Sequence, residues 1–64
     1  MNMQRDSKIP QFYTTDEVAA LLHLNVQTVR LLLQKKELGG IKIGVEWRVS
    51  EDHILEFIKD HENK

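Results

Sequence analysis

The sequence LLHLNVQTVRLLLQKK, residues Leu21 to Lys36, decides the fold. It indicates the end of one helix, a short turn, and a second helix that begins after Asn25, a residue type favoured as an N-cap. Only two or three residues separate the two helices, so the chain cannot reverse smoothly and the second helix must cross the first at a large angle. This arrangement is the helix-turn-helix pattern.

The predicted second helix has two different faces. One face is mainly apolar and carries Val29, Leu32, Leu33 and Lys36. The opposite stripe is mainly polar and carries Gln27, Arg30, Leu31 and Gln34. Lys35 and Lys36 come at the negative end of the helix dipole, where cations are favoured. We expect Gly39-Gly40 to end the helix by adopting positive φ.

The first helix is predicted to begin at Thr14. Glu17 follows three residues later, which is the spacing of a capping box, and Tyr13 and Val18 have the spacing of a hydrophobic staple. The helix is expected to run to about His23. Its apolar face is predicted to consist of Val18, Leu21 and Leu22.

Residues 41–49 predict a β-hairpin that has two possible registers. A two-residue Gly44-Val45 turn pairs Ile43 with Glu46 and mixes apolar and charged residues on each face. A three-residue loop at 44–46 pairs Ile43 with Trp47, and places four apolar residues on one face and Lys42 with Arg48 on the other. Gly44 at the first loop position favours the shorter turn. We nevertheless expect the longer loop, because burying the apolar face is worth several kcal/mol at roughly 25 cal/mol per Å².

Ser50 is predicted to cap a third helix that runs to about His61. Its apolar stripe is expected to be Ile54, Phe57 and Ile58, with Leu55 at the edge. The fold class is therefore mainly α with a small β-hairpin: a winged helix-turn-helix of three helices and a two-stranded wing. We assign residues 1–11 to a flexible N-terminal arm, 12–62 to the folded domain and 63–64 to a tail.

Composition narrows the class of protein. A chain of 64 residues without cysteine makes at most one domain and has neither disulfide nor thiolate metal site. No apolar run approaches the ~18 residues of a membrane span, so we expect no membrane association and a cytoplasmic location. The net charge is only −1, yet it is unevenly distributed. Residues 25–49 hold five bases and two acids (+3), whereas residues 50–64 hold five acids and two lysines (−3).

No set of residues predicts catalysis. None of the three histidines, His23, His53 and His61, has another at i, i+4 spacing, so the simplest interpretation is surface histidines rather than a zinc site. The glycines are turn residues and form no phosphate-cradling loop. We expect a protein that is not an enzyme and that holds no metal and no cofactor.

Candidate DNA-binding residues lie on the second helix, the hairpin and the start of the first helix. Glutamine pairs with adenine and arginine with guanine at major-groove edges, while lysine and helix N-terminal amides bind phosphates. Taken singly, each residue is more typical of an ordinary solvated surface, but together they lie where a winged helix-turn-helix would meet DNA. The candidates are Thr14, Thr15, Asn25, Gln27, Thr28, Arg30, Gln34, Lys35, Lys42 and Arg48.

Residues 14–30, TTDEVAALLHLNVQTVR, resemble the start of the excisionase-type helix-turn-helix family, a relative of MerR-type winged helix domains. The later segments KEL (36–38), IKIG (41–44) and WRV (47–49) resemble that family's helix end and wing. The resemblance implies that residues 25–34 form the major-groove helix, that Lys42 and Arg48 lie on a wing near the DNA backbone or minor groove, and that Trp47 packs under the hairpin.

The sequence also departs from that family at four positions. His23 stands where the turn usually has glycine, and Val26 and Leu31 replace residues that are often basic or polar. Glu46 occupies a wing-tip position that is often arginine. The last three differences remove positive charge from the expected interface.

The resemblance implies a protein that binds double-stranded DNA. The leading hypothesis is an architectural factor that bends DNA to assist a tyrosine recombinase (integrase), with several copies binding cooperatively and located on the nucleoid when bound. A small transcriptional regulator is the alternative within DNA binding. A protein-interaction module on the same fold is the alternative outside it, because Leu31 and Val26 place apolar side chains on the outer stripe.

Overall fold

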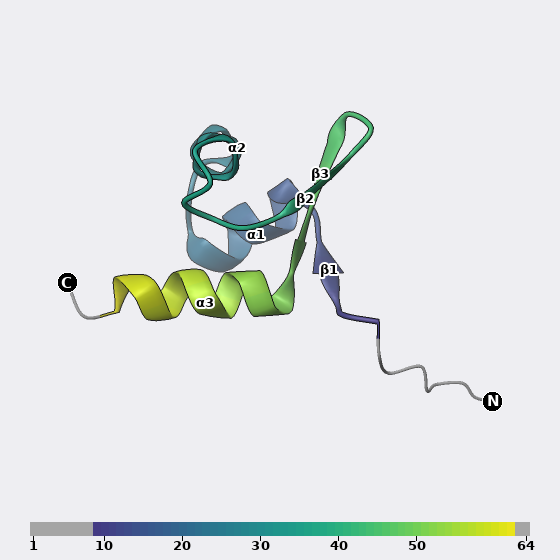
Figure 1. Ribbon diagram of the computed structural model, residues 1–64. Coiled ribbons are helices and arrows are strands. Elements are labelled where there is room, and N and C mark those ends of the chain that lie inside the picture. The colour runs from purple at the N-terminus through teal and green to yellow at the C-terminus, as the bar shows by residue number, and fades with distance from the viewer. Residues whose placement is uncertain (1–8, 63–64) are drawn as a thin grey trace.

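The structure is a computed structural model that describes residues 9–62. The elements follow one another as β1 (Phe12–Tyr13), α1 (Thr15–Leu22), α2 (Val26–Gln34), β2 (Ile41–Ile43), β3 (Glu46–Ser50) and α3 (Glu51–His61) (Figure 1). Three helices and an antiparallel hairpin confirm the predicted fold class. Most of the predicted arm, with its cations Arg5 and Lys8, and the predicted tail at 63–64 lie outside the described residues.

Each helix begins where its capping residue predicts. The Thr14 side chain accepts a hydrogen bond from the Glu17 amide (3.1 Å), and the Thr14 amide donates to the Glu17 carboxylate (2.9 Å), which completes the capping box. Asn25 Oδ1 accepts from the Gln27 amide (2.7 Å), and Ser50 Oγ accepts from the His53 amide (3.1 Å). Three local signals thus fix the starts of α1, α2 and α3.

The turn between α1 and α2 depends on a left-handed histidine. His23 adopts φ 58° and ψ 44°, the left-handed region that glycine adopts most readily. Its conformation lets the Leu24 amide donate to the carbonyl of Ala19 (2.8 Å), so the last turn of α1 is closed and the chain is redirected into α2. The tight turn holds α2 against α1.

The end of α2 differs from the prediction. Lys36, not a glycine, adopts the left-handed conformation (φ 64°), and the Lys36 and Glu37 amides donate to the carbonyls of Leu33 and Leu32 (3.1 and 2.9 Å). These two bonds form a Schellman motif, so the helix ends at Gln34. Neither Gly39 nor Gly40 has positive φ.

Gly39 and Gly40 have a different function, which is close packing. A Cβ on Gly40 would lie 2.6 Å from Leu33 Cδ2, and one on Gly39 would lie 2.5 Å from the His53 ring. Both distances are below the ordinary van der Waals range. The pair therefore allows the link after α2 to pass directly over the core and enter β2.

The hairpin adopts the register that we did not expect. Ile43 pairs with Glu46, Lys42 with Trp47 and Ile41 with Arg48, around a two-residue Gly44-Val45 turn. Gly44 has φ 63° while Val45 does not have positive φ, the pattern of a type II′ turn whose twist suits a hairpin. Turn conformation decided the register, and Ile43 (62% exposed) and Ile41 remain largely in solvent.

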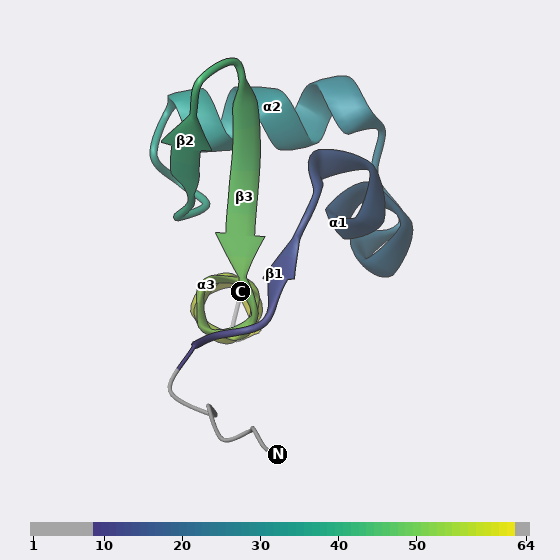
Figure 2. The same cartoon turned by 90° about the vertical axis from the view of Figure 1, so that its right-hand side faces the viewer.

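A third strand, which the sequence analysis did not predict, completes the sheet. Phe12 and Tyr13 pair antiparallel with Ser50 and Val49, which gives the strand order β1-β3-β2. The Glu51 amide also donates to the Gln11 carbonyl (2.9 Å). β1 therefore attaches the start of α1 to the strand that carries the wing residues, as Figure 2 shows.

The core lies between α1, α2, β3 and the start of α3. Its buried residues are Val18, Ala19, Val29, Leu33, Leu38, Val49 and Ile54. Leu22, Trp47 and Phe57 pack against this cluster as partly buried residues. The prediction for Leu21 was wrong, since this side chain is 54% exposed and Ala19 takes its place in the buried face of α1.

Candidate nucleic-acid interface

Three segments that are distant in the sequence line one groove of about 250 Å³. They are the start of α1, the middle of α2 and the tip of the wing. The lining residues are Thr14, Thr15, Asp16, Arg30, Val45, Glu46, Trp47 and Arg48. The groove thus brings together four predicted DNA-binding residues, namely Thr14, Thr15, Arg30 and Arg48.

The outer face of α2 carries three of the other candidates, Gln27, Thr28 and Gln34. Its stripe of Gln27, Thr28, Arg30, Leu31 and Gln34 is exposed, while Val29 and Leu33 are buried on the opposite face. An α-helix with its side chains is about 10–12 Å across. It therefore fits a major groove roughly 12 Å wide, and the glutamines and arginine of α2 are residue types that read base edges there.

The two ends of α2 supply exposed polar residues as well. The side-chain oxygen of Asn25, Oδ1, is used as the N-cap of α2. The NH₂ group of the same side chain is therefore the part that remains to bind a ligand. Lys35 is the C-cap and is exposed. Both residues flank the stripe rather than lie within it.

The start of α1 contributes less to anion binding than the sequence indicated. The Thr14 amide already donates to the Glu17 carboxylate, so it is engaged within the capping box. Asp16 lines the same groove and adds a negative charge that the sequence analysis did not place there. Thr15, the first residue of α1, is half-buried at the groove wall.

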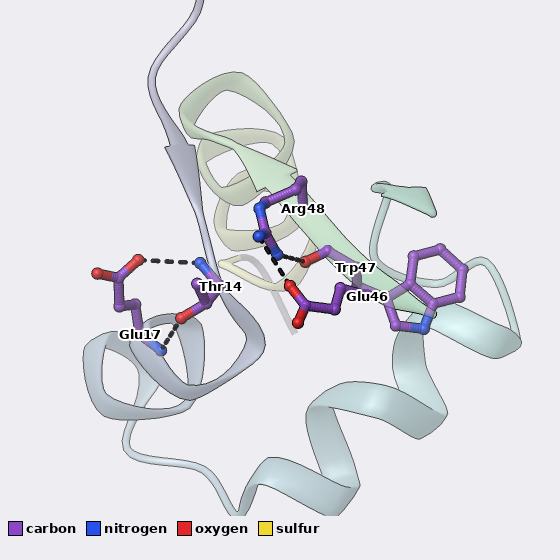
Figure 3. Close-up of polar contacts among 5 residues, drawn as sticks. All are labelled: Thr14, Glu17, Glu46, Trp47 and Arg48. Carbon is purple, nitrogen blue, oxygen red and sulfur yellow. Dashed lines mark hydrogen bonds and ion pairs between the residues drawn. The ribbon is translucent and has the colours of Figure 1, made fainter. Parts of the chain in front are cut away.

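On the wing, Arg48 is held by two contacts. Nη1 donates to the Trp47 carbonyl (3.0 Å), and Nη2 donates to Glu46 Oε1 (2.8 Å) in an ion pair. Figure 3 shows both side chains on the side of β3 that faces the start of α1, with the Trp47 ring on the other side. The side chains of Arg48 and Glu46 are 35% and 63% exposed, so solvent and ligands reach this pair.

Lys42 and Arg48 do not share a face, contrary to the prediction. In the observed register Lys42 is opposite Trp47, and its Nζ lies 5.7 Å from the centre of the Trp47 ring. This is the range of a cation–π contact. Trp47 itself packs against the core beneath the hairpin, as expected for the wing tryptophan.

The two apolar residues expected on the outer stripe of α2 behave differently. Val26 is half-buried and packs against the core, so the prediction that it lies on the outer surface was wrong. Leu31 is 51% exposed beside Arg30. At the wing tip Val45 is 90% exposed.

Charge is distributed by position in the fold. α2 and the hairpin tip lie at one end of the molecule and α3 lies at the other (Figures 1 and 2). Among its eleven residues α3 carries Glu51, Asp52, Glu56 and Asp60 against the single lysine Lys59. The acidic surface is therefore turned away from the groove, which keeps its repulsion from an anionic ligand small.

The part of the chain that the structure describes contains neither a candidate metal site nor a candidate membrane-spanning helix. Residues 9–62 contain no group of three or more metal-ligating side chains. No helix among them has the length and apolar character that crossing a bilayer requires.

One comparison with known proteins gave a match. A family model described as a helix-turn-helix domain matches residues 12–62, a range that includes every helix and strand among the described residues 9–62. No curated protein and no solved structure matches the chain.

Proposed function

The chain belongs to the helix-turn-helix domain family, and we propose that it is a sequence-specific DNA-binding protein of the excisionase-like, architectural kind. Membership in this family indicates binding of double-stranded DNA. The observation that carries the rest of the proposal is the groove in which the start of α1, Arg30 of α2 and Arg48 of the wing converge. One duplex that runs along this side of the molecule would contact all three.

Base recognition is assigned to the outer face of α2. Arg30 is the residue suited to a bidentate contact with guanine, and Gln27 and Gln34 are suited to adenine. Thr28 is suited to a thymine methyl group or a phosphate. These side chains are exposed on a helix whose other face is buried, so the reading surface is held rigidly by the core.

Backbone contacts are assigned to the flanking residues. Lys35 at the end of α2 and Lys42 and Arg48 on the wing would neutralise phosphates on either side of the bases that α2 reads. Lys42 and Arg48 point to opposite faces of the hairpin, and we propose that the duplex curves toward the wing to meet both. Such curvature would suit an architectural role better than a simple blocking role.

Bending sets a requirement on the number of copies. Smooth bending of a 20–30 bp site by 40–90° costs of order 1–6 kcal/mol. One copy has few cations at its interface, and Asp16 and Glu46 oppose them there. We therefore propose that several copies bind adjacent sites cooperatively and that the bent DNA assists a tyrosine recombinase. The role needs no active site, and the bound protein would be located on the nucleoid.

Leu31 supports a second candidate function. An apolar side chain that is half exposed beside Arg30 suits a contact with a protein, either a neighbouring copy or a transcription or recombination partner. A transcriptional regulator would use the same DNA interface without the requirement for a bend. Measurement of the bend angle on a bound duplex separates these roles.

The salt dependence of binding tests the DNA interface. The duplex is obtained by selecting, from a random library, the sequences that the protein retains. We expect the protein to bind this duplex. With roughly three to five phosphate contacts, the log of the association constant should fall against log salt with a slope of about −3 to −4.5. Lys59→Ala on α3 is the matched control and should leave this slope unchanged. Failure to bind any duplex at low salt would refute the proposal.

A further inference from the structure

The groove contains a carboxylate in direct contact with a cation that the proposed function needs. Glu46 and Arg48 are two residues apart on β3, so their side chains lie on the same face of the strand. Glu46 Oε1 accepts a hydrogen bond from Arg48 Nη2 at 2.8 Å, and both residues line the groove. The acid therefore occupies a donor that a DNA phosphate would use.

We propose that Glu46 is an internal competitor of the DNA backbone for Arg48, and that it sets the contribution of the wing to affinity. This inference rests on the proposed DNA-binding function. In the free protein the carboxylate neutralises the guanidinium. In the complex a DNA phosphate replaces the Glu46 carboxylate on Arg48, and the carboxylate moves out into solvent. The protein thus exchanges one ion pair of Arg48 for another and gains no additional pair.

The geometry of the pair suits such an exchange. A carboxylate and a phosphate both accept from the fork of N–H donors on a guanidinium, so the two anions compete for the same atoms. Arg48 keeps a second hydrogen bond from Nη1 to the Trp47 carbonyl, which can hold the guanidinium in place while Glu46 leaves. Glu46 is the more exposed partner and lies beside the hairpin turn, so its side chain has room to swing away.

The competitor model differs from simple repulsion in its dependence on Arg48. If Glu46 only repelled DNA through its charge, its removal would strengthen binding whether or not Arg48 were present. If it competes for Arg48, most of that gain requires the arginine. Asp16 offers a matched comparison, because it lines the same groove from α1 and makes neither a hydrogen bond nor an ion pair with Arg48.

The test is a double-mutant cycle in the full chain. Dissociation constants for one selected duplex are measured by fluorescence anisotropy at several salt concentrations. The proteins compared are wild type, Glu46→Gln, Arg48→Ala and the double variant Glu46→Gln/Arg48→Ala. Thermal unfolding followed by circular dichroism checks that each variant is folded. Asp16→Asn, alone and with Arg48→Ala, is the control for a groove acid, and Glu56→Gln is the control for total charge.

We expect Glu46→Gln to tighten binding about 3- to 10-fold, because the phosphate then meets a guanidinium that no carboxylate neutralises. Its log–log salt slope should change by much less than about 0.9, because Arg48 neutralises one phosphate in both complexes and only the displacement of the carboxylate differs. In the Arg48→Ala background the gain should fall below about twofold. The smaller gain from Asp16→Asn should be the same in both backgrounds.

Two results would overturn the proposal in different ways. If Glu46→Gln strengthened binding equally with and without Arg48, Glu46 would be a source of general repulsion and not a competitor, while DNA binding itself would stand. If no variant bound DNA at low salt, the proposed function would fail and the competitor role with it.

Discussion

Two single residues illustrate how local chemistry sets this interface. Arg30 is the one residue of α2 that reaches the groove, and it is also the only arginine on the outer stripe. His23 takes a left-handed conformation that glycine adopts without steric cost, yet it holds α2 in place. In the proposed function Arg30 contacts DNA, and His23 sets the angle at which α2 is presented to it.

Replacement of Arg30 should affect specificity as well as affinity. We expect Arg30→Ala to cost about 1–3 kcal/mol of binding free energy and to relax the preference at one base pair. Lys42→Ala should instead weaken binding to all duplexes about equally, since it removes a backbone contact. Selection from a random library, repeated with each variant, measures both effects. If both variants bound and selected like the wild type, the assignment of the helix and wing would be wrong.

Replacement of His23 should affect stability and leave DNA contacts in place. His23→Gly is expected to raise the free energy of unfolding by about 0.5–1 kcal/mol, because glycine adopts positive φ without a Cβ clash. His23→Val should lower the free energy of unfolding, because a β-branched residue is a poor fit in this region. Urea denaturation of both variants measures the difference. Equal stability of the glycine and valine variants would contradict the importance of this turn.

The interactions that form the helices and strands connect residues at different separations along the chain. The starts of α1, α2 and α3 are decided by Thr14, Asn25 and Ser50 within one turn of each helix. The hairpin register is decided by the backbone at Gly44, and it overrides the burial of Ile41 and Ile43. Pairing of β1 with β3 then joins the start of α1 to the wing.

The observed register makes a direct prediction for solution NMR. Around a two-residue turn the pair next to the turn is hydrogen-bonded, and the following pair is non-hydrogen-bonded with the closest Cα atoms. Lys42 and Trp47 form that second pair. We therefore expect a strong Hα–Hα nuclear Overhauser effect between Lys42 and Trp47. A strong effect between Lys42 and Arg48, which are the second pair around a three-residue loop, would indicate the other register.

The separation in sequence between interacting residues also explains how much of the structure could be predicted from the sequence. The helix starts followed from residues within a few positions, so they were predicted correctly, whereas the importance of the turn at His23 was noted only through the family resemblance. The end of α2 at Lys36 was missed, because a lysine with positive φ has no sequence signal comparable to the nearby glycines. The groove was foreseen only in part. Asp16 enters it because β1 pairs with β3, and a two-residue strand is too short to show a periodic pattern.

At the scale of the whole molecule, charge and shape act together. The basic segments α2 and the wing occupy one end, and the acidic helix α3 occupies the other. A net charge of −1 thus conceals a molecule with two chemically different ends. In the proposed function such a distribution would orient the protein as it approaches DNA, so that the groove would meet the duplex before α3 does.

The central claim is that the groove and the outer face of α2 form the DNA-binding surface. Its most direct test is a titration of the ¹⁵N-labelled protein with its selected duplex, in which amide chemical shifts are measured. We predict that the largest shifts fall on residues 14–16, 25–35 and 42–48, and that residues 52–60 of α3 change little. Shifts concentrated on α3, or no change with any duplex at low salt, would contradict the assignment of the groove and the outer face of α2 as the DNA-binding surface.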